Sequence, residues 1–156
     1  MKVFPYFATP NMELQTVADS IDLAATPDEV WSLIGPFAFD WHPLVVKATL
    51  TGTGIGQLRT LGTLDGGQVI ERLEAIDDTK RFYRYTQIAG LSTSRYVGTL
   101  EVKPNGGGSI VDWRVQFLAD NKPDIIVKDR VSRLIKAGFE SLKSRFGVRS
   151  DRAHTA

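Results

Sequence analysis

The chain has 156 residues, of which 42% are hydrophobic and 24% charged, with a formal net charge of +1. These values are typical of one globular domain, and the near-neutral charge gives no field that would attract nucleic acid or an anionic membrane. The absence of cysteine excludes disulfides, thiol nucleophiles and thiolate metal ligands.

We interpret residues 1–156 as one domain that begins with a loosely held extension, residues 1–11. Pro5 and Pro10 interrupt any apolar core in that extension, so it does not resemble a signal peptide. No apolar run approaches the length that spans a membrane. We therefore expect a cytoplasmic protein without a membrane span.

The first expected elements are a strand over residues 14–23 and a short helix that begins at Thr26. Thr26 can cap this helix, Pro27 suits its first turn, and Glu29 completes a capping box. Gly35 and Pro36 end its apolar stripe. A second short helix is expected over residues 37–41.

Strands are then predicted in quick succession, because short β-type runs alternate with turn sequences rich in glycine, aspartate and asparagine. Their expected ranges are 45–51, 56–64, 68–77, 81–88, 94–103 and 109–118. In the last strand apolar and polar residues alternate, which indicates one dry and one wet face. The dry positions are Val111, Trp113, Val115 and Phe117.

A long helix is predicted over residues 123–146, followed by a frayed polar tail over residues 147–156. Its apolar residues fall within an arc of roughly 140° at about 100° per residue. A helix with one such stripe must lie against the dry face of the sheet. This order of elements predicts a curved antiparallel sheet that grips one helix around a cavity.

Several segments carry a resemblance to a known family. They are Ala25–Trp31, Trp41-His42-Pro43, Glu71-Arg72-Leu73 with Asp77-Asp78, Tyr83-Arg84-Tyr85, Tyr96–Val102 and Val111-Asp112-Trp113. As an ordered set, they resemble the START-like superfamily, also called SRPBCC or the birch-pollen-allergen fold. The group to which they are most similar is that of the polyketide cyclase/dehydrase and lipid-transport proteins.

The resemblance implies an α+β helix-grip fold, with about seven antiparallel strands around a long carboxyl-terminal helix and two short helices after the first strand. Proteins of this kind bind lipids, hormones, polyketides or other hydrophobic molecules, and a minority catalyse cyclisation or dehydration. Because members differ widely in function, the fold alone does not define the activity.

Glu71 is the strongest candidate for a ligand-binding or catalytic residue. It shares a strand face with Val69 and Leu73, and Arg59 is expected diagonally opposite across the turn at residues 65–67. An inward pair would orient a polar ligand group, or Glu71 would act as a base. The alternatives are a purely structural ion pair, or an outward-facing Glu71 if the strand register slips by one residue.

His42 is the other candidate proton carrier, and with Trp41 it is expected at the cavity mouth. The alternative for His42 is a local hydrogen-bonding role. No spacing of histidine and acidic residues is typical of a metal site, so we predict no metal, and no motif predicts a cofactor.

Aromatic residues are expected on the cavity wall, where a ring with a polar tip suits an apolar ligand; these are Tyr83, Tyr85, Tyr96 and Trp113. Plain core packing is the alternative. On the long helix, Gly138 is tolerated at a cost of about 1 kcal/mol if it leaves room for a ligand or a close strand. Its neighbours are expected to form the cavity roof: Ile135, Phe139 and Leu142.

Binding of a small hydrophobic molecule (a lipid, a polyketide or an aromatic compound) is the leading hypothesis. The second is a cyclase, aromatase or dehydratase with Glu71 or His42 as base and Arg59 or a tyrosine stabilising an enolate. A third is an interaction module that uses the sheet edge or the outer face of the long helix at Arg133 and Lys136. A homodimer is compatible with any of these.

Overall fold

The architecture is a seven-stranded antiparallel sheet curved around one long helix. The computed structural model describes residues 13–91, 93–120 and 122–149; the predicted extension over residues 1–11 lies outside them. The elements in chain order are β1 (Gln15–Leu23), α2 (Pro27–Ile34), β2 (Val45–Thr51), β3 (Leu58–Thr63), β4 (Gln68–Asp77), β5 (Phe82–Ala89), β6 (Thr93–Asn105), β7 (Gly108–Ala119) and α3 (Asp124–Phe146).

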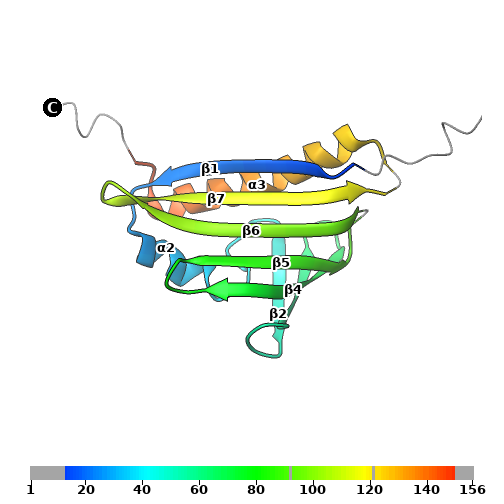
Figure 1. Cartoon of the computed structure of the whole chain (residues 1–156), viewed down its shortest axis with the longest axis horizontal. Helices are drawn as coiled ribbons and strands as arrows, with labels where there is room; N and C mark the ends of the chain where they lie inside the picture. The colour runs from blue at the N-terminus through cyan, green and yellow to red at the C-terminus, as the bar shows by residue number, and fades with distance from the viewer. Residues whose placement is uncertain (1–12, 92, 121, 150–156) are drawn as a thin grey trace, which may run out of the picture.

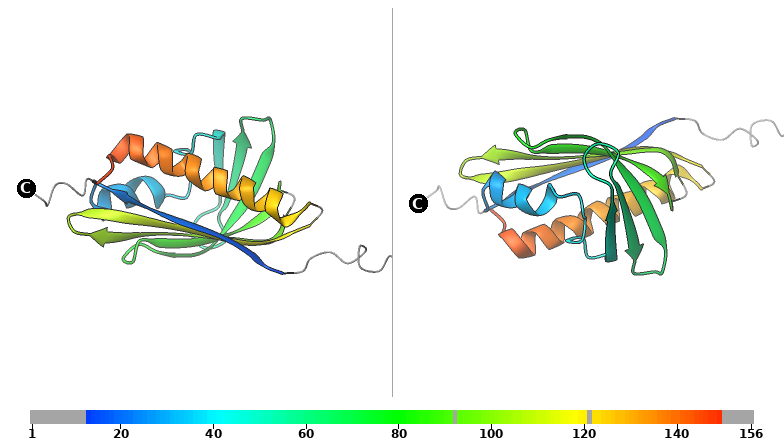
Figure 2. Two further views of the ribbon diagram at one scale, coloured as in Figure 1. Left: turned by 90° about the horizontal axis from the view of Figure 1, so that it is seen from above. Right: turned by 90° about the horizontal axis from the view of Figure 1, so that it is seen from below.

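The strands follow the order β1-β7-β6-β5-β4-β3-β2, so the first strand pairs with the last and the others are joined as successive hairpins. Figure 1 views the sheet from its outer face, with α3 behind it. Figure 2 shows α3 running obliquely across the inner face, with α2 close to its carboxyl-terminal end. This is the α+β helix-grip fold predicted from the order of elements.

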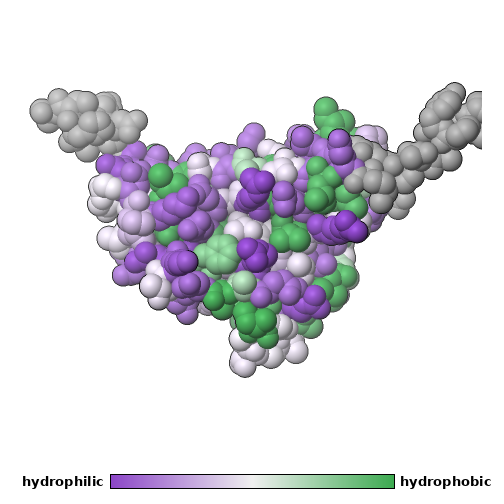
Figure 3. Space-filling model, in the orientation of Figure 1, coloured by the Kyte–Doolittle hydropathy of each residue, from purple (hydrophilic) through white to green (hydrophobic). Residues whose placement is uncertain are grey.

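The inner face of the sheet and the apolar stripe of α3 form the core. On β7, Val111, Trp113, Val115 and Phe117 are buried, as the alternation predicts. The outer face in Figure 3 is mostly hydrophilic. Burial of one face of the sheet fixes the register, because a slip of one residue would expose the whole apolar set.

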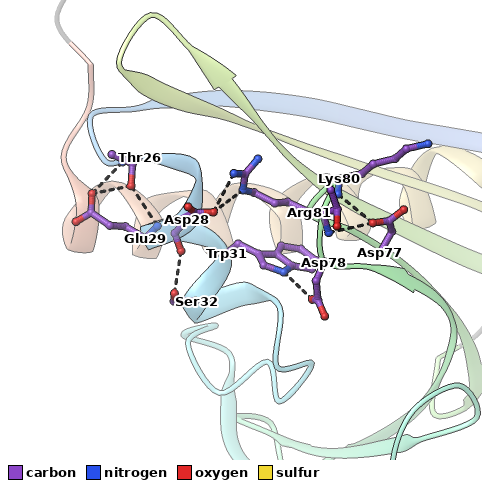
Figure 4. A network of polar contacts seen from close by, with 10 residues as sticks. Thr26, Asp28, Glu29, Trp31, Ser32, Asp77, Asp78, Lys80 and Arg81 are labelled. Atoms are coloured by element: carbon purple, nitrogen blue, oxygen red, sulfur yellow. Dashed lines mark hydrogen bonds and ion pairs between the residues drawn. The ribbon is translucent and has the colours of Figure 1, made fainter.

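Helix α2 is capped at its amino terminus and tied to the sheet at the β4–β5 turn (Figure 4). Thr26 and Glu29 form the predicted capping box at its amino terminus. At the other side the indole Nε1 of Trp31 donates to Asp78, 2.9 Å away, and Arg81 pairs with Asp28 at 2.9 Å. The helix is therefore anchored to the β4–β5 turn as well as capped.

The second short helix predicted over residues 37–41 is wrong. Phe37 and Phe39 have φ values of 69° and 62°, which no right-handed helix contains. Each left-handed residue costs about 1–2 kcal/mol. In return both rings are buried and pack on the guanidinium of Arg59, so tertiary packing overrides the local helical preference.

The polar tail predicted from residue 147 begins later than expected. The Ala24 N–H donates to the carbonyl of Gly147 at 2.9 Å, and Val148 forms a bridge with Leu23. Arg149 donates to the backbone carbonyl of Asn105. Residues 147–149 are thus fastened to the sheet, and the remainder of the predicted tail lies outside the described residues.

Candidate functional site

A cavity of about 390 Å³ lies between the inner face of the sheet and the amino-terminal half of α3. Drug-sized ligands occupy cavities of about 300–1,000 Å³. The lining comes from residues 39–45, strands β3 to β6, the turns after β3 and β5, and three residues of α3. Its side chains include those of Phe39, His42, Leu44, Leu61, Leu64, Asp65, Val69, Glu71, Tyr85, Leu91, Tyr96, Arg130, Arg133 and Leu134.

The cavity has a closed end and an open mouth. Phe39, Leu61, Glu71, Tyr85 and Tyr96 are all buried, and they define the closed end. The residues at the mouth are exposed: Leu44, Leu64, Asp65, Leu91, Arg130 and Arg133. The lining is thus apolar along most of its depth, with polar atoms gathered at both ends.

Glu71 lies at the closed end and faces the cavity. Arg59 is its direct partner across β3 and β4, rather than the diagonal neighbour that the sequence suggested. The Arg59 Nε donates to Glu71 Oε1 at 2.8 Å. The described residues supply Glu71 with no other hydrogen bond, so its second carboxylate oxygen remains available to a ligand. Burial raises the pKa of Glu71, and the adjacent guanidinium opposes this shift.

Arg59 sits behind Glu71 and does not line the cavity. Its Nη1 donates to the Phe37 carbonyl at 3.2 Å and to the Tyr83 hydroxyl at 3.3 Å. The centre of the guanidinium lies 4.1 Å from the centroid of the Phe37 ring and 4.3 Å from that of Phe39, within the range of cation–π attraction. Among the described residues its Nη2 finds no hydrogen-bond partner. Arg59 therefore holds Glu71 in place from within the core.

Tyr85 and Tyr96 complete the closed end. The Tyr85 hydroxyl accepts a hydrogen bond from Trp113 Nε1 at 3.1 Å, and the centroids of the Tyr85 and Tyr96 rings lie 6.5 Å apart. Burial raises the pKa of both phenols, so both stay protonated in water near neutrality. The Tyr85 ring lies directly over Gly98 on the paired strand, where an added Cβ would overlap it. A glycine inside a strand is the sequence signal for such close packing.

His42 lines the cavity but is committed to the backbone. Its Nε2 lies 2.8 Å from the Leu134 carbonyl oxygen, and its Nδ1 lies 3.1 Å from the Leu44 nitrogen. Because Nδ1 accepts from an N–H, Nε2 carries the proton and donates to Leu134. Burial lowers the pKa of His42, which favours this neutral form. The geometry matches the local hydrogen-bonding alternative and leaves no nitrogen for proton transfer.

The predicted cavity roof is wrong in its position along α3. Ile135, Gly138, Phe139 and Leu142 are buried in the core, between one and eight residues beyond Leu134, the last residue of α3 in the cavity lining. A Cβ at Gly138 would lie 2.8 Å from Trp113 Cζ3 and 2.9 Å from His42 Cδ2. The glycine therefore makes room for two rings of the protein rather than for a ligand. Leu134, Arg130 and Arg133 take the position predicted for the roof.

Of the twelve residues predicted to contact a ligand, four line the cavity: His42, Glu71, Tyr85 and Tyr96. Trp41, Tyr83 and Trp113 are buried in the core instead. Five of the fifteen wall residues that were not predicted are leucines, which carry no sequence signal of their own. Arg130 and Arg133 had a signal, because they flank Leu134 at the border of the apolar stripe.

Neither helix among the described residues is both long enough and apolar enough to cross a bilayer. Within the same residues no three histidine or acidic side chains gather closely enough to hold a metal ion.

The curved sheet, the long helix and the cavity between them define a helix-grip fold. Residues 15–147 match the family model described as polyketide cyclase/dehydrase and lipid transport. The chain belongs to this family. The comparison with curated proteins gives no match.

Solved structures agree with this assignment. XoxI from Bacillus cereus is 29% identical, with a TM-score of 0.79, over 84% of this chain and 94% of that one. A protein from Bacillus thuringiensis has the same identity and TM-score over 85% of this chain and 98% of its own. Norcoclaurine synthase from Thalictrum flavum, solved with dopamine and hydroxybenzaldehyde, is 18% identical, with a TM-score of 0.68, over 85% of this chain and 86% of that one. The last of these supports the fold alone.

Proposed function

We propose that this protein binds or carries a small hydrophobic molecule (a lipid, a polyketide or an aromatic compound) in the cavity between the sheet and α3. The observation that carries the proposal is the cavity itself, about 390 Å³ in volume with a largely apolar lining and a polar closed end. Burial of apolar surface would supply most of the affinity, at about 25 cal/mol per Å² before the costs of association.

The closed end supports a ligand with a hydrogen-bond donor at its inner tip. Glu71 offers a carboxylate oxygen that the described residues leave without a hydrogen bond. A hydroxyl, phenol or amine would satisfy it, whereas a purely apolar tip would leave a buried carboxylate poorly solvated. The polar end would therefore select among ligands whose apolar bodies fit equally well.

Native mass spectrometry of the purified protein, with organic extraction of whatever is bound, tests this function. A co-purifying hydrophobic molecule with a donor group would support it, and its structure would identify the ligand class. An empty protein that also fails to bind neutral fluorescent probes would contradict it.

A second candidate function is enzymatic, and the raised pKa of Glu71 inside the cavity favours it. Glu71 would remove a proton from carbon next to a carbonyl group, while the Tyr85 or Tyr96 hydroxyl would stabilise the enolate oxygen. Arg59 would act as a positioning residue, because Glu71 separates it from the cavity. His42 is the weaker base, since both of its nitrogens are engaged.

Deuterium exchange into the methyl group of acetophenone in D₂O, followed by NMR, tests the base directly. Catalysed exchange that disappears in Glu71→Gln, while binding of acetophenone persists, would support the enzyme. Exchange at the uncatalysed rate with saturating protein would favour the carrier function alone.

A further inference from the structure

The cavity mouth carries charges of opposite sign on its two sides. Arg130 and Arg133 lie on the α3 side, and Asp65 lies on the side of the β3–β4 turn. Hydrogen bonds from Thr63 Oγ1 and the Gly67 N–H lower the pKa of Asp65, so this carboxylate is ionised near neutrality. A charged ligand group would therefore meet attraction on one side of the mouth and repulsion on the other.

The two arginines differ in their availability. Arg133 forms an ion pair with Asp129, one turn earlier, at 2.9 Å. Arg130 is exposed, and within the described part of the chain it has neither an ion-pair nor a hydrogen-bond partner. A guanidinium in this state can offer its fork of N–H donors to a carboxylate or a phosphate.

The surface around Arg130 at the mouth is apolar. Leu44, Leu64 and Leu91 line the mouth with 37%, 64% and 38% of their surface exposed. Deeper in, Leu61, Val69 and Leu134 continue this apolar wall to the closed end. A molecule that satisfies the whole site is thus apolar along its body and anionic at its outer end, and it carries a hydrogen-bond donor at its inner tip for Glu71.

The direction in which the ligand enters follows from Glu71. An anionic head driven to the closed end would meet this buried carboxylate, and two like charges in a desolvated site repel strongly. At the mouth the same head would stay hydrated and reach Arg130. The two ends of the cavity therefore favour a single orientation, with the acidic group outward.

We infer that the ligand is an amphipathic anion, with a carboxylate or phosphate head held by Arg130 at the α3 side of the mouth and an apolar body in the cavity. This inference rests on the proposed function, because it assigns a charge to the ligand of that same cavity.

Displacement of the neutral dye Nile red from the full chain tests it, with dodecanoate, dodecyl phosphate and dodecan-1-ol as competitors of equal chain length. Arg130→Gln removes the free cation, and Asp65→Asn removes the opposing charge while keeping an oxygen that can accept from Thr63 and Gly67. Arg114→Gln is the matched control, since Arg114 is exposed on the outward side of β7. The expected effect of Arg130→Gln is an affinity loss of about three- to tenfold for both anions.

Asp65→Asn is expected to act in the opposite sense and tighten binding of both anions, most clearly at low salt. Dodecan-1-ol should bind equally well to every variant, and Arg114→Gln should match the unaltered protein throughout. Selective weakening for dodecyl phosphate would identify a phosphate head, and selective weakening for dodecanoate a carboxylate.

Three results would distinguish failure of the inference from failure of the proposed function. Binding of Nile red and dodecan-1-ol with no change for the anions in Arg130→Gln and Asp65→Asn would overturn the anionic ligand and leave the carrier function standing. An equal effect of Arg114→Gln would overturn it as well, since the mouth would then have no special role. Failure of Nile red and all three competitors to bind would contradict the proposed function itself.

Discussion

The imidazole of His42 donates from Nε2 to the carbonyl oxygen of Leu134, 2.8 Å away, and so connects the segment before β2 to the middle of α3. The same ring accepts the Leu44 N–H at Nδ1. Since Leu44 and Leu134 both line the cavity, this one side chain fixes the distance between two of its walls.

We predict that the free energy of unfolding falls as the pH drops below about 6.5, the ordinary histidine value. Burial lowers the pKa of His42 in the folded protein, so in this window the unfolded chain binds a proton that the folded one does not. Denaturant unfolding between pH 7.5 and 5.0 measures this slope, which one group limits to about 1.4 kcal/mol per pH unit. His42→Gln should be less stable at pH 7.5 but lose less stability on acidification; an unchanged slope in this variant would contradict the assignment.

Gly98→Ala should destabilise the protein by about 1–3 kcal/mol or more, because the new methyl group would overlap the Tyr85 ring. Gly62→Ala is the matched control. Gly62 also lies in a strand, but a Cβ there would have no neighbour nearer than 3.7 Å. Urea unfolding should separate the two variants clearly. Equal effects would mean that the close packing of Tyr85 on Gly98 does not govern the cavity wall.

Gly138→Ala should also destabilise the protein, although helix propensity alone favours alanine over glycine by about 1 kcal/mol. The added Cβ would press on Trp113 and His42. A double-mutant cycle with His42→Ala measures the overlap between the new Cβ and the imidazole. In the His42→Ala background, Gly138→Ala should cost less stability than it does in the unaltered protein. Strict additivity of the two changes would show that His42 does not compete for this space.

The Arg59–Glu71 pair should respond unequally to loss of either partner. Arg59→Met should cost about 3–5 kcal/mol, because it leaves the Glu71 carboxylate buried without its cation. Glu71→Gln should cost less, since the amide oxygen can still accept from Arg59, which also keeps its contacts with Phe37 and Tyr83. Thermal unfolding of both variants compares their losses of stability. A larger loss in Glu71→Gln than in Arg59→Met would contradict the placement of Arg59 behind Glu71.

The sequence predicted most of the fold because each element carries its own local signal. The capping box at Thr26 and Glu29, the alternation along β7 and the stripe on α3 all led to elements that the structure contains. The helix prediction for residues 37–41 failed because the conformation of this segment depends on a partner far along the chain. Its two phenylalanines pack on Arg59, and nothing local to them reveals that.

The candidate site was harder to predict for a geometric reason. Strand alternation put Glu71 on one face with Val69 and Leu73, and Tyr85 on one face with Tyr83, but left open which face is the inner one. In the structure both Glu71 and Tyr85 are buried. The cavity, however, depends on where α3 crosses the sheet, and the stripe on a helix gives its buried face but not its point of contact. Ile135, Gly138 and Phe139 were therefore assigned to a roof that Arg130 and Leu134 help to form.

The most direct test of the account is a titration with Nile red that compares the unaltered protein with Val69→Trp. The indole would fill the cavity from β4, where Val69 is only partly buried. Ile88→Trp is the control, because Ile88 is an exposed apolar residue of β5 outside the cavity lining. The account predicts saturable binding to the unaltered protein and to Ile88→Trp, with most of it lost in Val69→Trp. Equal binding to all three proteins would place the hydrophobic site elsewhere and contradict it.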